Sequence, residues 1–198
     1  MQHRIEDVAT AADHIGRACP QTPKTALVLG SGLGDWIETG AVRLRIPYGD
    51  IPGFPVSTVK GHAGALLLAD IDGTPVFVLS GRFHLYEGYD ARTVTLPIRV
   101  LGLLGVTTLI ATNAAGALNP LFATGGLMVL TDHINMTGHN PLTGPNVEAW
   151  GPRFPDMTEA YSPRLIGIAD SAAGEMGLKF RHGVYAGLSG PCYETAAE

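Results

Sequence analysis

The sequence predicts an α/β fold in which a mixed, largely buried β-sheet is flanked by helices. Three observations lead to this prediction. Short apolar runs of strand length alternate with longer segments whose apolar residues recur at helical spacing. Glycine and proline are spread along the chain as turn signals and are not concentrated in a linker. Several apolar runs end in small or polar residues, which is typical of the edge of an open sheet where ligands bind.

The first half of the chain predicts a helix followed by three strands. The helix is indicated by apolar residues at helical spacing from Ile5 to Ala18. Residues 25–29 predict a buried strand that leads into the glycine-rich stretch 30–34. Residues 65–69 and 76–79 predict two more strands, and the Asp72-Gly73 pair between them is a strong hairpin signal.

The second half continues the alternation of strands and helices. In chain order we expect a helix over 91–104 kinked at Pro97, a buried strand over 108–112, a strand over 127–130 that ends at Asp132 and His133, a long loop over 136–157, a helix over 162–176 and a strand over 183–187. The loop is long enough to suggest a functional role.

Length and composition favour one domain that spans residues 1–198. Hydrophobic residues make up 45% of the chain, and charged residues only 16%, which favours subunits that bury part of their surface. The net charge is −5 and we find no Lys/Arg cluster, so nucleic acid is not an expected partner. Cys19 and Cys192 lie far apart, form no CxxC pair and have no metal-binding spacing, so we expect two free thiols. Without a signal-peptide pattern or a membrane-length apolar run, we expect a cytoplasmic protein.

The glycine-rich stretch GSGLG at 30–34 fits neither common nucleotide-binding motif. The dinucleotide fingerprint requires a glycine where Asp35 stands, and no Gly-Lys-Ser/Thr follows as a P-loop requires. A turn of this kind can still present backbone N–H groups and the Ser31 hydroxyl to an anion. Taken alone, the motif is weak, and a tight turn that binds nothing is the better interpretation of the stretch.

The stretch SGRFHLYEGY at 80–89 brings unusual chemistry to the end of a predicted buried strand. Residues two apart in an extended chain point the same way, so Arg82 and His84 could converge on one ligand. The arginine offers a planar set of donors that suits phosphate. The alternative is that Arg82 pairs with Glu87 and the aromatic residues only pack.

Two further stretches carry weaker signals. Residues 112–116, TNAAG, have small side chains that would let the backbone approach a ligand, although a simple turn explains them too. Residues 52–64 form a Pro/Gly-rich loop that carries His62. A single histidine in a loop is more often solvated than functional.

Seven short stretches, these four among them, together carry a family resemblance. In chain order they are GSGLG, PGFPxSTVxGHAG, GRFHxYEGY, TNAAGxLNP, DHIN, RFPxM and GPxYETxAE. The set resembles the trimeric purine nucleoside phosphorylases, and specifically their inosine–guanosine branch, from about residue 25 to the end of the chain. The related methylthioadenosine phosphorylases differ in the GRFHxYEG stretch and fit less well.

The resemblance implies a role for each matching position. Phosphate would be bound by Ser31, His62, Arg82, His84 and the backbone at Ala114; ribose by Tyr86 and by Phe154 of a neighbouring subunit; and the purine by Tyr193 and Glu194. It also implies a homotrimer that uses inorganic phosphate as co-substrate and needs neither cofactor nor metal.

The implied reaction is the reversible conversion of a purine nucleoside and phosphate into the free base and ribose 1-phosphate. As the glycosidic bond breaks, the sugar gains positive charge, which a phosphate anion held beneath it stabilises before attacking. An ionised Glu194 only accepts hydrogen bonds, which favours the N1–H of inosine and guanosine over adenosine. The alternative for Glu194 is a carboxylate at a helix start, and both interpretations can hold together.

The chain departs from the family pattern at its C-terminus. Family members continue past Glu198 with a Gly-Met-Ser segment, a base-binding Asn and a His near the ribose, none of which has a match in this sequence. We therefore expect a C-terminally truncated phosphorylase domain that is a poor enzyme in this form.

Three alternative functions differ in what they require. A nucleosidase that uses water has no need of the anion site, so Ser31, Arg82 and His84 argue against it. A shortened, non-catalytic purine- or phosphate-binding relative is supported only by the abrupt end of the chain. A dinucleotide-dependent oxidoreductase is excluded by the glycine spacing.

Overall fold

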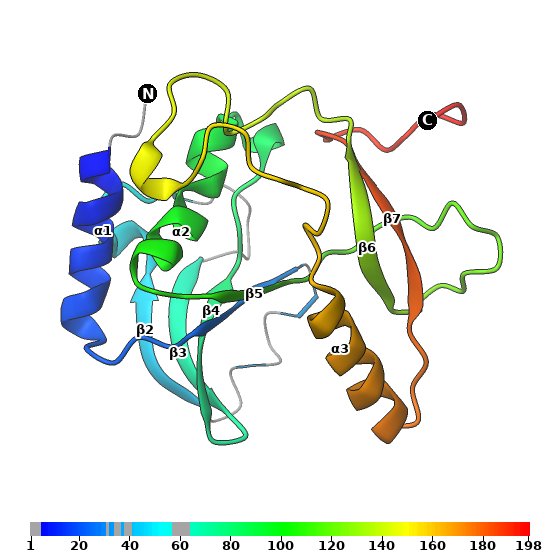
Figure 1. The fold of residues 1–198 in the computed structure, drawn as a ribbon, viewed down its shortest axis with the longest axis horizontal. Helices are drawn as coiled ribbons and strands as arrows, with labels where there is room; N and C mark the ends of the chain where they lie inside the picture. Colours follow the sequence, from blue (N-terminus) through cyan, green and yellow to red (C-terminus); the bar gives the residue numbers. More distant parts are fainter. Residues whose placement is uncertain (1–4, 31, 34–36, 38–40, 57–63) are drawn as a thin grey trace. The chain divides into compact units, whose positions relative to one another are not determined.

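The structure is a computed structural model that describes residues 5–30, 32, 33, 37, 41–56 and 64–198. The chain forms two compact units, the first extending to Ala114 and the second running from Ala115 to Glu198. Figure 1 shows the elements in chain order, from α1 in blue to the C-terminal segment in red.

The first unit contains a five-stranded mixed sheet. Its strands are β1 (Thr25–Leu29), β2 (Val42–Pro47), β3 (Ala65–Ile71), β4 (Thr74–Ser80) and β5 (Thr108–Ala111). They are ordered β2-β3-β4-β1-β5. β1 runs parallel to both of its neighbours, β4 and β5, whereas β3 is antiparallel to β2 and β4. The predicted mixed α/β fold is therefore confirmed.

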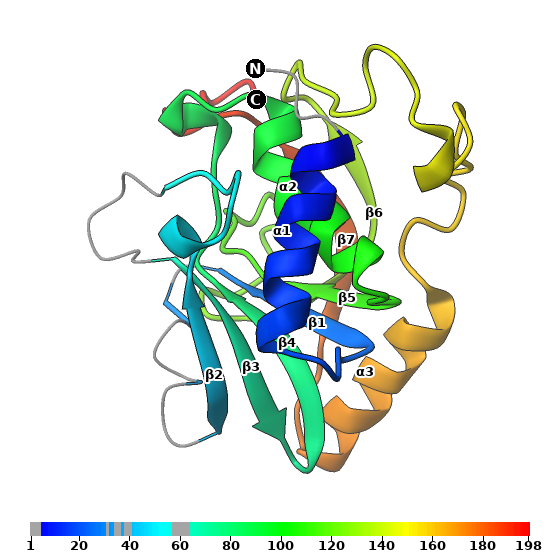
Figure 2. The same ribbon diagram turned by 90° about the vertical axis from the view of Figure 1, so that its left-hand side faces the viewer.

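Two helices of the first unit lie side by side (Figure 2). Helix α1 (Ile5–Ala18) buries the apolar face that the sequence spacing predicted, including Val8 and Ile15. Helix α2 (Ala91–Leu103) begins after Asp90, whose side chain accepts a hydrogen bond from the Thr93 N–H. The expected Pro97 lies inside α2 and is buried.

The strands of the β3–β4 hairpin contribute many of the buried residues of the first unit. Asp72 and Gly73 both have positive φ, 49° and 79°, which a two-residue turn of the predicted kind requires. The strands on either side are buried on both faces, with Leu66 and Leu67 on β3 at 1% and 0% exposure. Short apolar runs buried on both faces are what the sequence predicted for these strands.

The strand β2 is an element that the sequence pattern did not predict. Its residues VRLRIP alternate between exposed arginines, Arg43 and Arg45, and more buried apolar positions such as Ile46. A period of two was present, but two charged residues in so short a run hid it. The strand is at an edge of the sheet, where charged side chains on one face are tolerated.

The second unit contains β6 (Met128–Asn135), β7 (Arg181–Gly187) and α3 (Pro163–Glu175). The two strands pair in parallel, as Figure 1 shows. Helix α3 begins after Ser162, whose hydroxyl accepts from the Leu165 N–H, and has a proline in its first turn. The predicted helix over 162–176 is confirmed, and the strand predicted over 183–187 begins two residues earlier, at Arg181.

Two expectations about strands were wrong. Asp132 and His133 do not end their strand, because they pair with Val184 and Tyr185 and the backbone ladder continues past them to Asn135. The strand at 108–112 is not buried: β5 lies at the sheet edge, with Leu109 and Ile110 at 42% and 51% exposure.

Both cysteines are free thiols, with Cys19 buried and Cys192 exposed. Within the described part of the chain, no helix is long and apolar enough to cross a membrane.

Candidate functional site

The candidate site lies where three neighbouring strands of the first unit end. β4, β1 and β5 are adjacent and parallel, so their carboxyl ends lie at the same edge of the sheet. Directly after them come three of the motifs that the sequence singled out, beginning at Gly81, Gly30 and Thr112. The prediction that these motifs share one edge is confirmed.

The backbones at this edge approach each other closely. The Gly30 N–H donates to the Thr112 Oγ1 at 2.8 Å, and the Arg82 Nη1 donates to the Thr112 carbonyl oxygen at 3.1 Å. A Cβ on Gly30 would lie 2.6 Å from that oxygen, 2.9 Å from the Asn113 Cα and 3.0 Å from the Arg82 Nη1. Only glycine fits at position 30 without displacing its neighbours.

Arg82 and His84 leave the chain on the side opposite to Phe83. Phe83 is 4% exposed and packs its ring 5.1 Å from the ring of Tyr48, whereas Arg82 and His84 are half-buried. This alternation is the one predicted from an extended chain. Both basic side chains are therefore less buried than the phenylalanine between them.

His84 is held by Glu87 in the short 3₁₀ helix η3 (Leu85–Glu87). The Glu87 Oε1 accepts from the His84 backbone N–H at 2.9 Å and lies 2.8 Å from the His84 Nδ1. The Glu87 side chain is only 1% exposed. With a proton on Nδ1 donated to the carboxylate, the Nε2 of His84 is the ring nitrogen left for a ligand. The sequence suggested Glu87 only as a partner of Arg82, and this pairing with His84 was missed.

Tyr86 lies beside His84 at the same edge. The two rings stack with centroids 4.6 Å apart and planes inclined by 16°. Tyr86 is 47% exposed, so a large part of its ring faces solvent. An aromatic ring in this position offers an apolar surface next to the basic groups.

Tyr48 supports the site from the core side, and no sequence pattern pointed to it. It is 2% exposed, and its hydroxyl donates to the carbonyl oxygen of Gly81, the residue before Arg82, at 2.8 Å. A Cβ on Gly64 would lie 2.2 Å from the Tyr48 ring, so glycine is required there too. Burial raises the pKa of the Tyr48 phenol above its ordinary value.

Of the remaining three predicted phosphate ligands, the structure describes only Ala114. Ser31 and His62 lie outside the described residues. Ala114 is the last residue of the first unit and is exposed, and its carbonyl oxygen accepts from the Asn113 Nδ2 at 3.2 Å. Among the described residues, no group of His, Cys, Asp or Glu side chains could hold a metal ion.

Phe154 lies in the long loop of the second unit and is 87% exposed. The guanidinium carbon of Arg153 lies 5.9 Å from the centroid of the Phe154 ring, and the Arg153 Nη1 donates across the loop to the Leu142 carbonyl at 2.8 Å. After the loop, the Tyr161 hydroxyl contacts the His133 Nδ1 at 3.3 Å. The loop is therefore held by internal contacts next to a largely exposed aromatic side chain.

Tyr193 and Glu194 also belong to the second unit. Tyr193 is 96% exposed and Glu194 is exposed. In the next four residues, the Thr195 N–H donates to the Glu198 carboxylate at 2.7 Å and the Glu198 N–H donates to the Thr195 hydroxyl at 3.4 Å. This reciprocal pair is the capping-box pattern of a helix start. The residues that make this pair are Thr195 and Glu198, which flank a turn at 196–197, and Glu194 precedes them.

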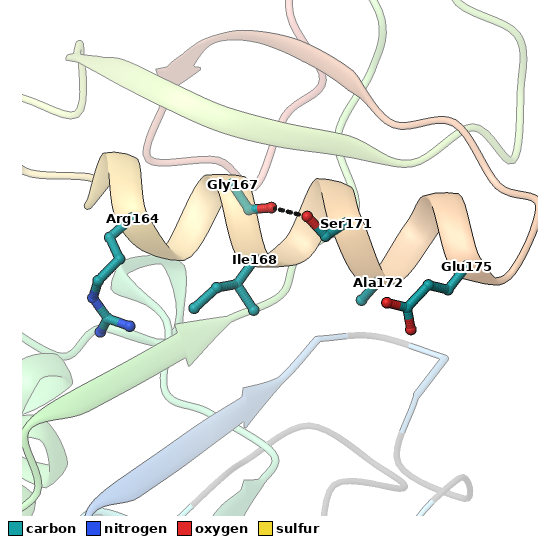
Figure 3. A pocket seen from close by; sticks show the side chains of 6 residues that line it. All are labelled: Arg164, Gly167, Ile168, Ser171, Ala172 and Glu175. Atoms are coloured by element: carbon teal, nitrogen blue, oxygen red, sulfur yellow. Dashed lines mark hydrogen bonds between the residues drawn. The ribbon is translucent and has the colours of Figure 1, made fainter.

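A shallow depression lies on one face of α3 (Figure 3). Its lining residues are Arg164, Gly167, Ile168, Ser171, Ala172 and Glu175. The Ser171 hydroxyl donates to the Gly167 carbonyl of its own helix at 2.9 Å. None of the predicted site residues that the structure describes lines this depression.

Comparisons with known proteins place the chain in a broad class of enzymes. The sequence model of one protein family, the phosphorylase superfamily, matches residues 24–198. A curated relative, purine nucleoside phosphorylase 1 of Geobacillus stearothermophilus, is 51% identical over 191 residues, which cover 96% of this chain and 70% of the relative.

Solved structures agree with the curated relative. The structure of Schistosoma mansoni purine nucleoside phosphorylase with inosine has a TM-score of 0.89 at 44% identity, covering 98% of this chain and 70% of that one. A purine nucleoside phosphorylase solved with ribose-1-phosphate has a TM-score of 0.90 at 44% identity, covering 98% and 74%. The chain belongs to the purine nucleoside phosphorylase family.

Proposed function

We propose that this protein cleaves purine nucleosides with inorganic phosphate, giving the free base and ribose 1-phosphate. The observation that carries the proposal is the edge at the ends of β4, β1 and β5, where Arg82 and His84 are each held by a partner beside a glycine-rich turn. The family supplies the reaction, and this edge supplies the groups that the co-substrate needs.

Phosphate binding is the chemistry that these groups suit best. One Arg82 nitrogen is held by the Thr112 carbonyl, and a guanidinium has five N–H donors, so others are available to a phosphate oxygen. The His84 ring is fixed by Glu87 and offers Nε2. Ser31, His62 and the backbone at Ala114 complete the proposed phosphate site.

The sugar and the base would be bound by aromatic groups and one carboxylate. The half-exposed ring of Tyr86 stacks on His84 and would lie against the ribose. Phe154, from a neighbouring subunit, would cover the ribose from the other side. Tyr193 would pack on the purine and Glu194 would accept from N1–H, which favours inosine and guanosine over adenosine.

The mechanism follows from charge development in the sugar. When the glycosidic bond lengthens, positive charge grows at C1′, and a phosphate anion held by Arg82 and His84 stabilises it and then forms the new bond. Fixing both side chains in advance reduces the reorganisation required in the transition state. The bond that breaks joins the sugar to the purine nitrogen, and the bond that forms joins the sugar to a phosphate oxygen.

The quaternary proposal is a homotrimer. It is supported by the 87% exposure of Phe154, which lies beside the hydrogen bond between Arg153 and Leu142. An exposed aromatic ring would bury its apolar surface by packing on a partner subunit. We also propose a cytoplasmic, single-domain protein that binds no nucleic acid and requires no cofactor or metal.

The test is hypoxanthine release from inosine by the purified chain, with and without phosphate. Release that requires phosphate is the expected result, and Arg82→Ala should abolish it. Release without phosphate would indicate a nucleosidase. If the chain binds phosphate by calorimetry but releases no base, it is a binding relative, and if it does neither, the proposal is refuted.

A further inference from the structure

Thr112 is the residue at which the three strand ends of the candidate site are joined. It directly follows β5, and its backbone N–H and its hydroxyl both lie 3.0 Å from the carbonyl oxygen of Val28 on β1. The same hydroxyl lies 2.8 Å from the Gly30 nitrogen. The carbonyl of Thr112 receives the Arg82 Nη1 at 3.1 Å, which brings in the segment after β4.

The directions of these hydrogen bonds are fixed by the chemistry of the groups. The Val28 carbonyl only accepts, so the single hydroxyl proton of Thr112 is donated to it. The Gly30 N–H only donates, so a lone pair of the same hydroxyl accepts from it. The hydroxyl thus links the end of β1 to the first residue of the glycine-rich stretch, and a hydrocarbon side chain cannot make this link.

Gly30 is tightly confined in the same place. The space where its Cβ would be is occupied by the Thr112 carbonyl, the Asn113 Cα and the Arg82 Nη1, all within 3.0 Å. A small shift of Thr112 would therefore move both the start of the glycine-rich stretch and the arginine. Thr112 therefore contacts both the segment that follows β1 and the segment that follows β4.

We propose that Thr112 is a positioning residue for the phosphate site. Its hydroxyl holds the first N–H of the glycine-rich stretch, and its carbonyl orients the Arg82 guanidinium. The inference rests on the proposed function, because it takes Arg82 as a phosphate ligand. In this proposal Thr112 raises the affinity for phosphate through Gly30 and Arg82, without contacting the anion itself.

The test compares variants of Thr112 in the 198-residue chain. Thr112→Val keeps the shape and branching suited to a strand but lacks the hydroxyl, Thr112→Ala lacks it without adding bulk, and Thr112→Ser keeps it. Phosphate affinity is measured by titration calorimetry with inorganic phosphate, thermal stability by unfolding, and the KM values for phosphate and inosine wherever turnover is measurable.

We expect Thr112→Val and Thr112→Ala to weaken phosphate binding about tenfold, which corresponds to about 1.4 kcal/mol. The inosine KM should not change, and Thr112→Ser should bind phosphate like the unchanged chain. If Thr112→Val does not fold, the comparison of Thr112→Ala with Thr112→Ser gives the same answer.

Two outcomes would overturn the inference. Unchanged phosphate affinity in the variants without a hydroxyl would show that the link is dispensable. Equal loss in Thr112→Ser would show that the residue only supports the fold. Arg82→Ala separates this inference from the proposed function: if that variant still binds phosphate normally, the proposed phosphate site itself is wrong, whereas loss in Arg82→Ala with normal Thr112 variants refutes the role of Thr112 alone.

Discussion

Replacing Gly30 with alanine tests how tightly the strand ends are packed. The added Cβ would lie 2.6 Å from the Thr112 carbonyl oxygen and 2.9 Å from the Asn113 Cα, and both obstacles are backbone atoms that cannot swing aside like a side chain. Gly30 is not among the glycines with positive φ, so the strain comes from crowding and not from the backbone conformation.

The expected magnitude follows from the kind of crowding. Overpacking a well-packed region costs about 1–3 kcal/mol. In a chain of this size each kcal/mol lowers the melting temperature by about 2–4 °C, so Gly30→Ala should lower it by about 2–12 °C. Because the third crowded atom is the Arg82 Nη1, at 3.0 Å, phosphate affinity should fall as well.

The assay is thermal unfolding with and without inorganic phosphate. Gly49→Ala is the matched control, since a Cβ there meets nothing within 4 Å and Gly49 also lacks a positive φ. If Gly30→Ala were as stable as Gly49→Ala and equally stabilised by phosphate, the strand ends would not be packed as tightly as these distances indicate, and the reasoning would be refuted.

Three other changes test neighbouring features. Glu87→Gln should lower kcat/KM for phosphate about tenfold, because hydrogen bonds to an ionised group are about twice as strong as neutral ones and His84 would be less firmly held. Steady-state kinetics at saturating inosine measures this value, and an unchanged kcat/KM would contradict the prediction. Gly102→Ala in α2 should raise the free energy of unfolding by about 0.5–1 kcal/mol, as measured by denaturant titration, since its Cβ meets nothing within 4 Å; a loss of stability would show a hidden clash. Tyr48→Phe should cost about 1–3 kcal/mol by leaving the partly buried Gly81 carbonyl without its donor. Because burial raises the folded-state pKa of Tyr48, its contribution is present below the ordinary tyrosine pKa of about 10 and is lost as pH rises above it, so the Phe variant should lose less stability in alkaline unfolding titrations than the unchanged chain.

Local signals predicted the elements whose pattern is strong and self-contained. The Asp72-Gly73 pair forms the hairpin turn with both φ values positive, because only a few residue types adopt that conformation cheaply. The apolar spacing of α1 became its buried face. The strand β2 was missed because Arg43 and Arg45 interrupt its apolar residues, and the exposure of β5 could not be foreseen because an apolar run does not say whether its strand lies at the sheet edge.

In the candidate site, too, some features could be predicted from the sequence and others could not. The sequence by itself determined that Arg82 and His84 would leave one side of an extended stretch after a buried strand, and that several motifs would follow strand ends. Only the tertiary structure decided which partners hold them, because Thr112 lies 30 residues from Arg82 and 82 from Gly30 along the chain. Such contacts depend on the strand order β4-β1-β5, and strand order is a property of the whole sheet that no local pattern encodes.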